Sequence, residues 1–354
     1  MQIFKPYKRM DIAQYRLDGN ADAVEFCPND PFHHILAAAT YTLQEGDHPC
    51  RLGSISLFSI KIKEGLKLLQ HVETSGVFDI KWNPSHCNIH PQLAQADSDG
   101  YLTLHGLQCS SSISEFDGEF LQELCKTKIS SSMCLCLDWS PSAKSIATGL
   151  SDGSMAISTL REGSIHPEKA WKAHDFELWS ASFDTQQPEL IYTGADDCKF
   201  AGWDVRESTT KPIFQNSKTH KMGVCSISKC PNSLNLLLTG SYDEHLRLWD
   251  VRSMQRPIVE EELCLGGGVW RIKHHPYLEG LLLAACMHNG FSIIRIKDGV
   301  LEIVERYDRH ESLAYGADWQ KVDSSQSSGI ETKSFAATCS FYDQCLRVWI
   351  PKNS

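Results

Sequence analysis

The stretch HKMGVCSISKCPNSLNLLLTGSYDEHLRLWDVR, from His220 to Arg252, indicates the fold of this chain most clearly. Apolar and polar residues alternate in its first third and again toward its end, and residues 241–245 between them are typical of a turn. Alternation with a period of two, interrupted by turn residues, indicates short antiparallel strands. We expect His220 to hydrogen-bond the turn residue Asp243 and a strand hydroxyl while Trp249 packs beneath, because one satisfied buried polar network can fix a small sheet.

The same unit recurs along the chain. Each copy ends its first strand at an anchor residue, and the last four anchors lie 46, 45 and 45 residues apart. The earlier intervals are 56, 57 and 44 residues, because polar insertions lie around Gln44–Arg51 and Cys109–Glu119. A period of ~40–45 residues, with Trp-Asp closing the third strand, is typical of WD repeats. The seven anchors are Phe26, Trp82, Trp139, Phe183, Lys229, His274 and Trp319.

Seven units predict an all-β fold, a seven-bladed WD-repeat β-propeller in one domain. A single four-stranded sheet cannot cover both of its faces, so neighbouring blades stack and the ring must close. The last unit ends with its third strand, and we expect Asp11–Leu17 to supply the missing outer strand; the alternative is a disordered N-terminal tail. The blades are expected at residues 20–73, 74–130, 131–173, 174–217, 218–264, 265–308 and 309–350.

Composition restricts the class of function. The formal net charge of −10 argues against a nucleic-acid backbone as the main partner. No apolar run approaches transmembrane length, and the N-terminus lacks the apolar core of a signal peptide. The 14 cysteines include no CxxC pair, and the histidine-rich stretches lack cysteine partners at zinc spacing. We therefore expect a cytoplasmic monomer that binds no nucleic acid or membrane and holds no metal or cofactor.

Motifs do not identify a reaction. The chain contains no GxSxG, P-loop or GxGxxG sequence, and a propeller can host binding or catalysis, so the default is a protein-interaction scaffold. Channel-facing residues can still be located by counting, because equivalent positions of the blades lie at one height around the axis. Four residues before each anchor, where the innermost strand begins, this ring reads Asp22, Phe78, Leu135, Trp179, Cys225, Trp270 and Tyr315.

A second ring lies at the turn before each third strand. It reads Ser98, Ser151, Asp196, Tyr242, His288 and Tyr342 from the second unit onward. From the fourth unit on, the two rings collect two tryptophans, three tyrosines, a histidine, a cysteine and an aspartate, with Glu177 and Arg271 nearby. The sequence therefore predicts a functional face that is displaced toward blades four to seven.

Several stretches go beyond the general repeat pattern. They include WKAHDFELWSASF at 171–183, GGGVWRIKHHP at 266–276 and ATCSFYDQCLRVW at 337–349. Over almost the whole chain, the sequence resembles the WD-repeat diphthine methyl ester hydrolases (diphthine methylesterases) of the diphthamide biosynthesis pathway. The resemblance implies an enzyme that hydrolyses the methyl ester of an N-trimethylated, modified histidine of elongation factor two, giving diphthine for the final amidation. The alternative is a non-catalytic scaffold that docks the elongation factor.

Hydrolysis of an ester requires a nucleophile, a base and donors for the developing oxyanion. His288 is the only histidine of the two rings, and an unperturbed histidine pKa of ~6.5 suits a base at neutral pH. We expect Tyr242 or Arg271 to donate to the oxyanion and Asp196 to orient the protonated base. A Cys225 nucleophile with His288 as its base is the covalent variant, against which stands the simpler interpretation of a packed thiol.

The trimethylammonium group of such a substrate cannot donate hydrogen bonds. Aromatic faces and carboxylates are its natural receptor, and each good aromatic contact contributes ~0.5–2 kcal/mol. The alternative role for aromatic residues at a channel mouth is contact with the protein surface of a partner. The residues expected to form a cage are Trp179, Trp270, Tyr315, Tyr242 and Tyr342, with Glu177 or Asp196 adding negative charge.

Overall fold

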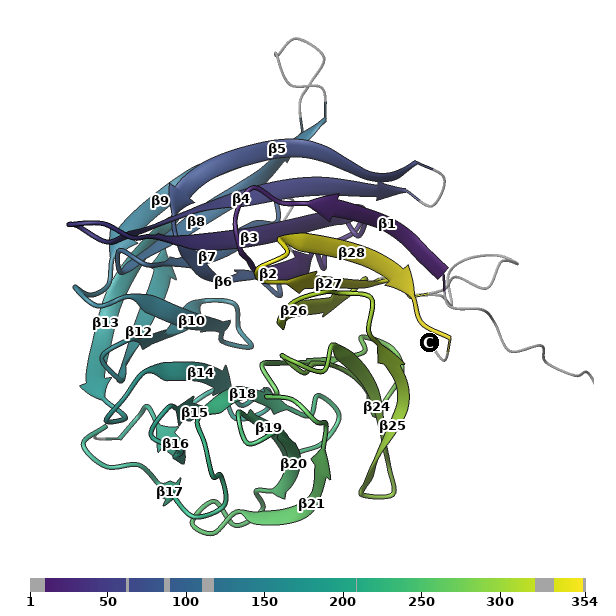
Figure 1. Cartoon of the computed structure of the whole chain (residues 1–354). Coiled ribbons are helices and arrows are strands. Elements are labelled where there is room, and N and C mark those ends of the chain that lie inside the picture. Colours follow the sequence, from purple (N-terminus) through teal and green to yellow (C-terminus); the bar gives the residue numbers. More distant parts are fainter. Residues whose placement is uncertain are drawn as a thin grey trace, which may run out of the picture.

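Seven small sheets surround one axis. The computed structural model describes residues 10–61, 64–85, 90–109, 118–207, 209–321 and 334–352. Within these ranges the chain forms 28 strands in seven four-stranded antiparallel sheets, which are arranged as the blades of a ring (Figure 1). This arrangement confirms the predicted all-β, seven-bladed propeller. No helix in the described part of the chain has the length and apolarity needed to span a membrane.

The first three blades follow the chain from the inside of the ring outward. Blade one contains β2 (Ala21–Phe26), β3 (Ile35–Gln44), β4 (Cys50–Lys61) and β5 (Gly65–Ser75). Blade two contains β6 (Val77–Trp82), β7 (Gln92–Asp97), β8 (Tyr101–Cys109) and β9 (Glu119–Lys128). Blade three contains β10 (Cys134–Trp139), β11 (Ser145–Leu150), β12 (Ser154–Arg161) and β13 (Ser164–Lys172). The insertion predicted around Gln44–Arg51 forms the end of the β3–β4 hairpin, whereas residues 110–117 of the second insertion lie outside the described residues.

The next three blades repeat this order. Blade four contains β14 (Leu178–Phe183), β15 (Leu190–Ala195), β16 (Phe200–Asp204) and β17 (Phe214–Asn216). Blade five contains β18 (Val224–Lys229), β19 (Leu236–Ser241), β20 (His245–Asp250) and β21 (Ile258–Cys264). Blade six contains β22 (Arg271–His274), β23 (Leu281–Ala285), β24 (Phe291–Lys297) and β25 (Val300–Tyr307).

Blade seven is built from both ends of the chain. It contains β26 (Ala314–Trp319), β27 (Ala336–Ser340), β28 (Cys345–Ile350) and, as its outer strand, β1 (Met10–Arg16). In Figure 1, β1 (purple) lies beside β28 (yellow), and the two pair antiparallel from Met10 opposite Ile350 to Arg16 opposite Cys345. The next residue, Leu17, is buried in the core that blades seven and one share. The predicted closure by an N-terminal strand is therefore confirmed.

Blade four contains the polar network that the repeat pattern predicts. The hydroxyl of Thr193 accepts a hydrogen bond from Trp203 Nε1 at 2.8 Å and lies 2.8 Å from His174 Nε2. His174 Nδ1 lies 3.0 Å from a carboxylate oxygen of Asp197 in the turn. All the polar atoms of this buried histidine thus have partners, as a buried network requires.

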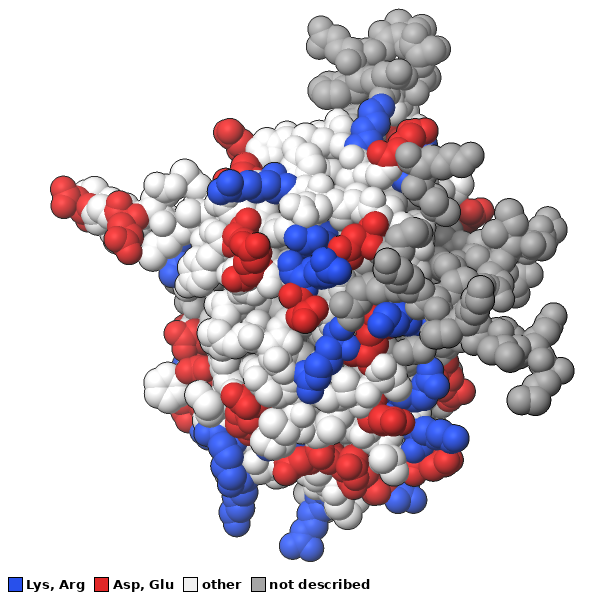
Figure 2. All heavy atoms as spheres, turned by 45° about the vertical axis from the view of Figure 1, so that its right-hand side comes forward, with Lys and Arg blue, Asp and Glu red and all other residues white. Residues whose placement is uncertain are grey.

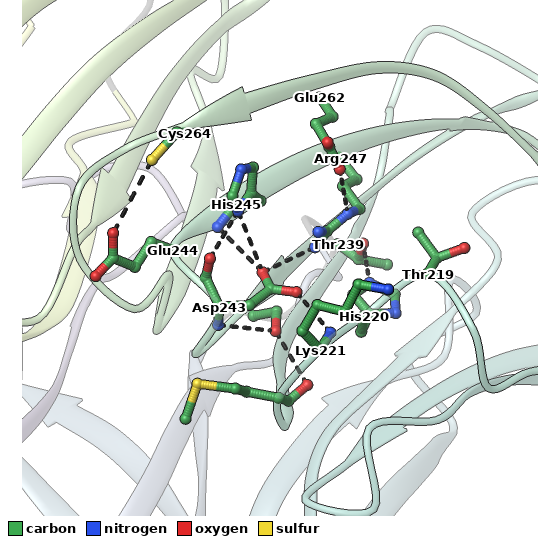
Figure 3. Close-up of polar contacts among 12 residues, drawn as sticks. Thr219, His220, Lys221, Thr239, Asp243, Glu244, His245, Arg247, Glu262 and Cys264 are labelled. Carbon is green, nitrogen blue, oxygen red and sulfur yellow. Dashed lines mark hydrogen bonds and ion pairs between the residues drawn. The ribbon is translucent and has the colours of Figure 1, made fainter.

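Blade five corrects one detail of the prediction. His220 Nε2 meets the Thr239 hydroxyl at 2.9 Å, but its Nδ1 has no hydrogen-bond partner among the described residues. Asp243 instead accepts a hydrogen bond from Arg247 Nη1 at 2.9 Å, so the direct bond predicted between His220 and Asp243 is wrong (Figure 3). The difference arises at the residue that pairs with the threonine across the sheet. This residue is the short Ala201 in blade four and Arg247 in blade five, where the guanidinium binds the Asp243 carboxylate.

Adjacent blades are joined by hydrogen bonds between their innermost strands. The indole Nε1 atoms of the anchors Trp82, Trp139 and Trp319 donate to backbone carbonyls of the preceding blade at 3.0–3.2 Å. In addition, Asp79 Oδ2 of blade two accepts a hydrogen bond from Leu137 N of blade three at 3.0 Å. The anchor tryptophans therefore hold neighbouring blades together as well as filling the core.

Deleting residues 1–18 should prevent formation of a stable ring. The deletion removes β1 and the buried Leu17, and it leaves β28 as an exposed edge strand that is prone to aggregation. We expect loss of soluble protein and a lower melting temperature in any soluble fraction, measured by circular dichroism. A truncated protein that melts at the temperature of the full chain would refute closure by β1.

Replacing Thr193 with valine should destabilise the protein by roughly 2–4 kcal/mol, because Trp203 Nε1 and His174 Nε2 would both lose a buried partner. Thr148 of blade three is a matched control, since its buried hydroxyl has no hydrogen-bond partner among the described residues. Thr148→Val should therefore be close to neutral. Urea unfolding of both variants measures the difference, and equal losses of stability would contradict the role assigned to the network.

Candidate functional site

The residues of the first predicted ring share one backbone feature, a β-bulge. In β2, β6, β10, β14 and β18, strand pairing skips one residue at the ring position, and in β26 it skips Tyr315 and Gly316. β22 begins one residue after Trp270. A bulge interrupts the regular alternation of side chains and re-aims the extra residue. The residues skipped in the first five strands are Asp22, Phe78, Leu135, Trp179 and Cys225.

Aromatic side chains of both rings meet at this end of the channel. Trp270 stacks on Tyr315 with ring centroids 4.8 Å apart, and it lies 5.4 Å from Trp179 and 5.8 Å from Tyr242. Two residues outside the predicted set extend this group on the side of blades seven and one. Phe341 lies 5.0 Å from Tyr315, and Tyr41 lies 5.0 Å from Phe341 and 4.5 Å from Phe78. We call this cluster the aromatic mouth; its members are Trp179, Tyr242, Trp270, Tyr315, Phe341, Tyr41 and Phe78.

A cavity of about 350 Å³ lies within the ring and reaches from the mouth to the opposite end. Trp179, Cys225 and Arg271 line it near the mouth, and Pro84 and Pro141 line it beyond the other ends of the inner strands. Both Trp179 and Trp270 have a buried indole Nε1 without a hydrogen-bond partner among the described residues. The mouth therefore contains aromatic ring faces, and two of its indoles have a buried N–H donor without a partner among the described residues.

An ion pair crosses the channel below the mouth. Arg271 Nη1 lies 3.1 Å from Asp79 Oδ1, which connects blades six and two, and these blades are not neighbours in the ring. Asp22 faces the same guanidinium from blade one. Burial raises the pKa of Asp22 to about 8, an effect that Arg271 opposes and Asp79 reinforces. Arg271 is thus already paired with Asp79, and it lies below the mouth. The predicted role as oxyanion donor requires an unpaired guanidinium at the mouth itself.

His288 lies apart from this cavity. It is exposed and lines a second cavity of about 600 Å³, which it shares with Tyr342 and with His310 of blade seven. It makes no hydrogen bond or ion pair with another described residue. Its neighbour Met287 packs against Tyr315 and Phe341, so His288 lies at the outer border of the aromatic mouth.

The thiol of Cys225 is closed off from this base. Cys225 is buried, its Sγ donates to the Gly223 carbonyl at 3.4 Å, and burial raises its pKa well above the usual range. No contact between Cys225 and His288 exists in the described part of the chain. The covalent variant lacks the adjacent base or positive charge that an activated thiol requires.

Tyr242 is held between two glycines. A Cβ atom added at Gly223 would lie 3.2 Å from the Tyr242 ring and 2.6 Å from Asp196 Oδ1, and one at Gly268 would lie 3.2 Å from the other side of the ring. Asp196 is exposed and Glu177 half-buried, and the amide of Asp196 donates to the Glu177 carbonyl at 2.9 Å. Both carboxylates predicted to aid cation binding therefore lie near the mouth, and Asp196 is the one that is exposed to water.

Comparisons with known proteins agree with the architecture and identify a family. The model of the WD domain, G-beta repeat, matches residues 121–157 and 212–250. A chain of a solved mitotic checkpoint complex covers 99% of this chain and 96% of itself with a TM-score of 0.71 at 15% identity, which shows a common fold.

Curated relatives are more specific. Mouse diphthine methyltransferase is 37% identical over 84% of this chain and 67% of its own length, and the Dictyostelium discoideum homologue is 34% identical over 95% and 97%. The Schizosaccharomyces pombe diphthine methyltransferase is 30% identical over 94% and 95%. This chain belongs to the diphthine methyltransferase family. Its role accordingly lies in diphthamide biosynthesis, and its relatives imply a protein substrate.

In this family member, the sequence pattern located most of the aromatic mouth, but it did not point to Tyr41 or Phe341 and it gave no role to Asp22. Asp22 stood in the first ring but was given no role, although it is the only carboxylate among the seven ring positions. Tyr41 and Phe341 follow neither counting rule. Phe341 lies one residue before Tyr342, and Tyr41 lies inside β3, so only the packing of blades seven and one shows their position.

The surface around the ring carries both signs of charge. On the face drawn in Figure 2, the Lys and Arg side chains of the described residues are interspersed with Asp and Glu side chains. Charge alone therefore does not mark a docking surface on that face of this family member.

Asp22→Asn should raise the melting temperature, and more at pH 8.5 than at pH 4.5. The unfolded carboxyl ionises near pH ~4, whereas the folded one stays protonated to about pH 8, so the free energy of unfolding of the native protein falls as the pH rises between these values. Asparagine remains neutral and removes this loss. Thermal unfolding at both pH values tests the prediction, and a variant that melts below the wild type at pH 8.5 would contradict it.

Proposed function

We propose that this protein hydrolyses the methyl ester of methylated diphthine on elongation factor two in the cytoplasm, giving diphthine for amidation. Membership of the diphthine methyltransferase family supports a role in this pathway. The observation that carries the proposal is the aromatic mouth, in which Trp179, Trp270 and Tyr315 come together above a buried acid. Such a site suits a permanent cation with methyl groups, because the faces of aromatic rings attract cations.

The substrate side chain would lie with its trimethylammonium group inward and its ester outward. The aromatic rings are partly or fully buried, whereas His288 at the border of the mouth is exposed to water. An ester held near this border would meet both His288 and the water that hydrolysis consumes. The two ends of the modified histidine thus have separate receptors.

In the proposed reaction, His288 takes a proton from a water molecule, whose oxygen attacks the ester carbonyl carbon. The tetrahedral intermediate then breaks its bond to the methoxy oxygen, which leaves as methanol after receiving the proton from His288. Burial raises the pKa of Tyr242, so its hydroxyl remains protonated and can donate to the developing oxyanion. Asp196, exposed beside Tyr242, would stabilise the protonated histidine.

Exposed apolar residues around the mouth fit a protein substrate. Phe176 and Met222 lie just before the innermost strands of blades four and five and are 58% and 52% exposed, and Tyr342 beside His288 is 69% exposed. Aromatic and methionine side chains are enriched at protein interfaces. These three residues would contact the surface of the elongation factor around the modified histidine.

Purified protein should convert methyl-esterified elongation factor two without any added enzyme, with a mass loss of one methylene per modified histidine. His288→Ala should reduce the turnover number by ~10²-fold, the usual contribution of a positioned base. His166→Ala, which alters an exposed histidine on the outer strand of blade three, is the matched control and should retain full activity.

Intact-protein mass spectrometry separates the alternatives to this reaction. Absence of conversion, with binding retained, would support the scaffold hypothesis instead. A mass gain when S-adenosylmethionine is supplied with the unesterified precursor would support methyl transfer, the reaction in the relatives' name. A His288→Ala variant with full activity would be compatible with hydrolysis but would show that His288 is not its base.

Replacing Trp179 or Trp270 with alanine should weaken binding of the trimethylated elongation factor by about tenfold, because a desolvated cation–aromatic contact contributes up to ~2 kcal/mol. Binding of the unmodified factor should change little. Tyr277→Ala is the control, since Tyr277 follows the opposite end of β22 and is 46% exposed there. Equal losses for both forms of the factor, measured by competition binding, would identify an interface patch and exclude the cage.

A further inference from the structure

The charged residues inside the channel form layers, and the deepest layer is electrically balanced. Lys81 pairs with Asp138 at 2.9 Å, Lys321 pairs with Asp318 at 3.2 Å, and Lys273 pairs with Glu25. Three carboxylates thus face three ammonium groups. Lys229, a further charged residue of the innermost strands, pairs separately with Asp184 at 3.7 Å.

The layer nearer the mouth is not balanced. It contains Asp22 and Asp79 but a single cation, Arg271. The guanidinium contacts Asp79 at 3.1 Å, and Asp79 also accepts the hydrogen bond from Leu137 N. The described part of the channel therefore leaves one carboxylate, Asp22, without a cation of its own.

Asp22 also lacks the hydrogen bond by which the other channel aspartates join neighbouring blades. Asp79, Asp138 and Asp318 each accept a backbone N–H from the next blade, at 2.8–3.0 Å. Asp22 is only 2% exposed, and its Oδ1 is buried without a hydrogen-bond partner among the described residues. An unpaired buried carboxyl is costly, so its presence calls for an explanation such as a ligand.

The surroundings of Asp22 determine which ligand it can accept. Tyr315 lies close to it. The next residue, Gly316, packs against the residues that follow Asp22, since a Cβ atom on Gly316 would come within 3.0–3.1 Å of the backbone of Ala23 and Val24. Tyr41, which packs on Phe78, lies close enough that Asp22 contributes to the raised pKa of its hydroxyl. The carboxyl therefore lies close to two tyrosines of the aromatic mouth, Tyr41 and Tyr315.

We propose that Asp22 is the counter-charge of the aromatic mouth and binds an alkylated ammonium group directly. The inference rests on the proposed function for the identity of the natural ligand, the trimethylammonium of the modified histidine. The class of ligand follows from the mouth itself. A primary ammonium needs several hydrogen-bond acceptors, whereas the indoles of Trp179 and Trp270 offer only donors and ring faces. The sequence suggested Glu177 and Asp196 for this charge, but Asp196 is exposed and Glu177 is only half-buried, and ion pairs of solvent-accessible carboxylates are weak.

Binding should then be coupled to release of a proton. Because the pKa of Asp22 is raised to about 8, only about one tenth of the molecules carry the carboxylate at pH 7 and about nine tenths at pH 9. An apparent dissociation constant varies inversely with the fraction of molecules competent to bind. A permanent cation should therefore bind about tenfold more tightly at pH 9 than at pH 7.

The other groups that face Asp22 keep their charge over this range. Burial raises the pKa values of Tyr41, Tyr315 and Cys339, so these groups remain neutral. Arg271 stays protonated, since the nearby carboxylates of Asp79 and Asp22 outweigh its burial and raise its pKa, and it remains paired with Asp79. The expected change in affinity with pH thus belongs to Asp22.

The test measures binding of choline to the full chain by isothermal titration calorimetry at pH 7 and pH 9. The uncharged isostere 3,3-dimethyl-1-butanol serves as the reference ligand. Wild-type protein should bind choline about tenfold more tightly at pH 9, and at pH 7 it should release close to one proton per choline, shown by repeating the titration in buffers of different ionisation enthalpy. Binding of the isostere should not change with pH.

Asp22→Asn should bind choline at least tenfold more weakly than the wild type at pH 9 and should bind the isostere equally well. Glu177→Gln and Asp196→Asn are the matched controls and should retain wild-type affinity for choline. Retained affinity in Asp22→Asn, loss in the two controls, or absence of proton release by the wild type would each overturn the proposal. None of these titrations involves an ester. The hydrolysis assay can therefore fail while choline binding supports this proposal, and choline binding can fail while hydrolysis is observed.

Discussion

The innermost strand of each blade has one edge without a neighbouring strand, and the amide groups on that edge must find partners inside the channel. Side chains from the preceding blade meet this need at several positions, and most of them are carboxylates. Buried carboxylates in turn require cations, because an unpaired buried charge is strongly destabilising. The charged channel is therefore a consequence of how the ring is joined. The bonds that join it are those of Leu137 N to Asp79, Phe183 N to Asp138, Phe26 N to Asp318 and Ile227 N to Ser180.

This requirement separates two kinds of acid in one channel. Asp138 and Asp318 hold neighbouring blades together and have lysine partners, so their presence needs no ligand. The Asp22 carboxyl accepts no backbone N–H from a neighbouring blade and has no cation of its own in the described structure, and Asp22 lies at the β-bulge of β2. Stability alone would favour a neutral residue there, whereas recognition of a cation gives the carboxyl a use.

The architecture could be predicted from sequence because its causes are local and repeated. Each blade encodes its own strand alternation, turn and anchor, and closure follows from a unit that lacks its fourth strand. The error in blade five has equally local causes that the motif does not contain. Whether His220 reaches Asp243 depends on the cross-strand neighbour of Thr239, and Arg247 there captures the carboxylate, whereas Ala201 in blade four leaves it free.

The site could be predicted only in part, for a different reason. Counting from the anchors located Trp179, Trp270 and Tyr315, because the bulge recurs at the same position in nearly every innermost strand. Charge balance does not recur in this way. The partner of Arg271 is Asp79, 192 residues away in the sequence and on a blade that is not adjacent in the ring. No local sequence pattern shows whether Arg271 pairs with Asp79 or with Asp22. Only the closed ring shows that Asp79 is held and Asp22 is not, and a ligand charge can be inferred only from that difference.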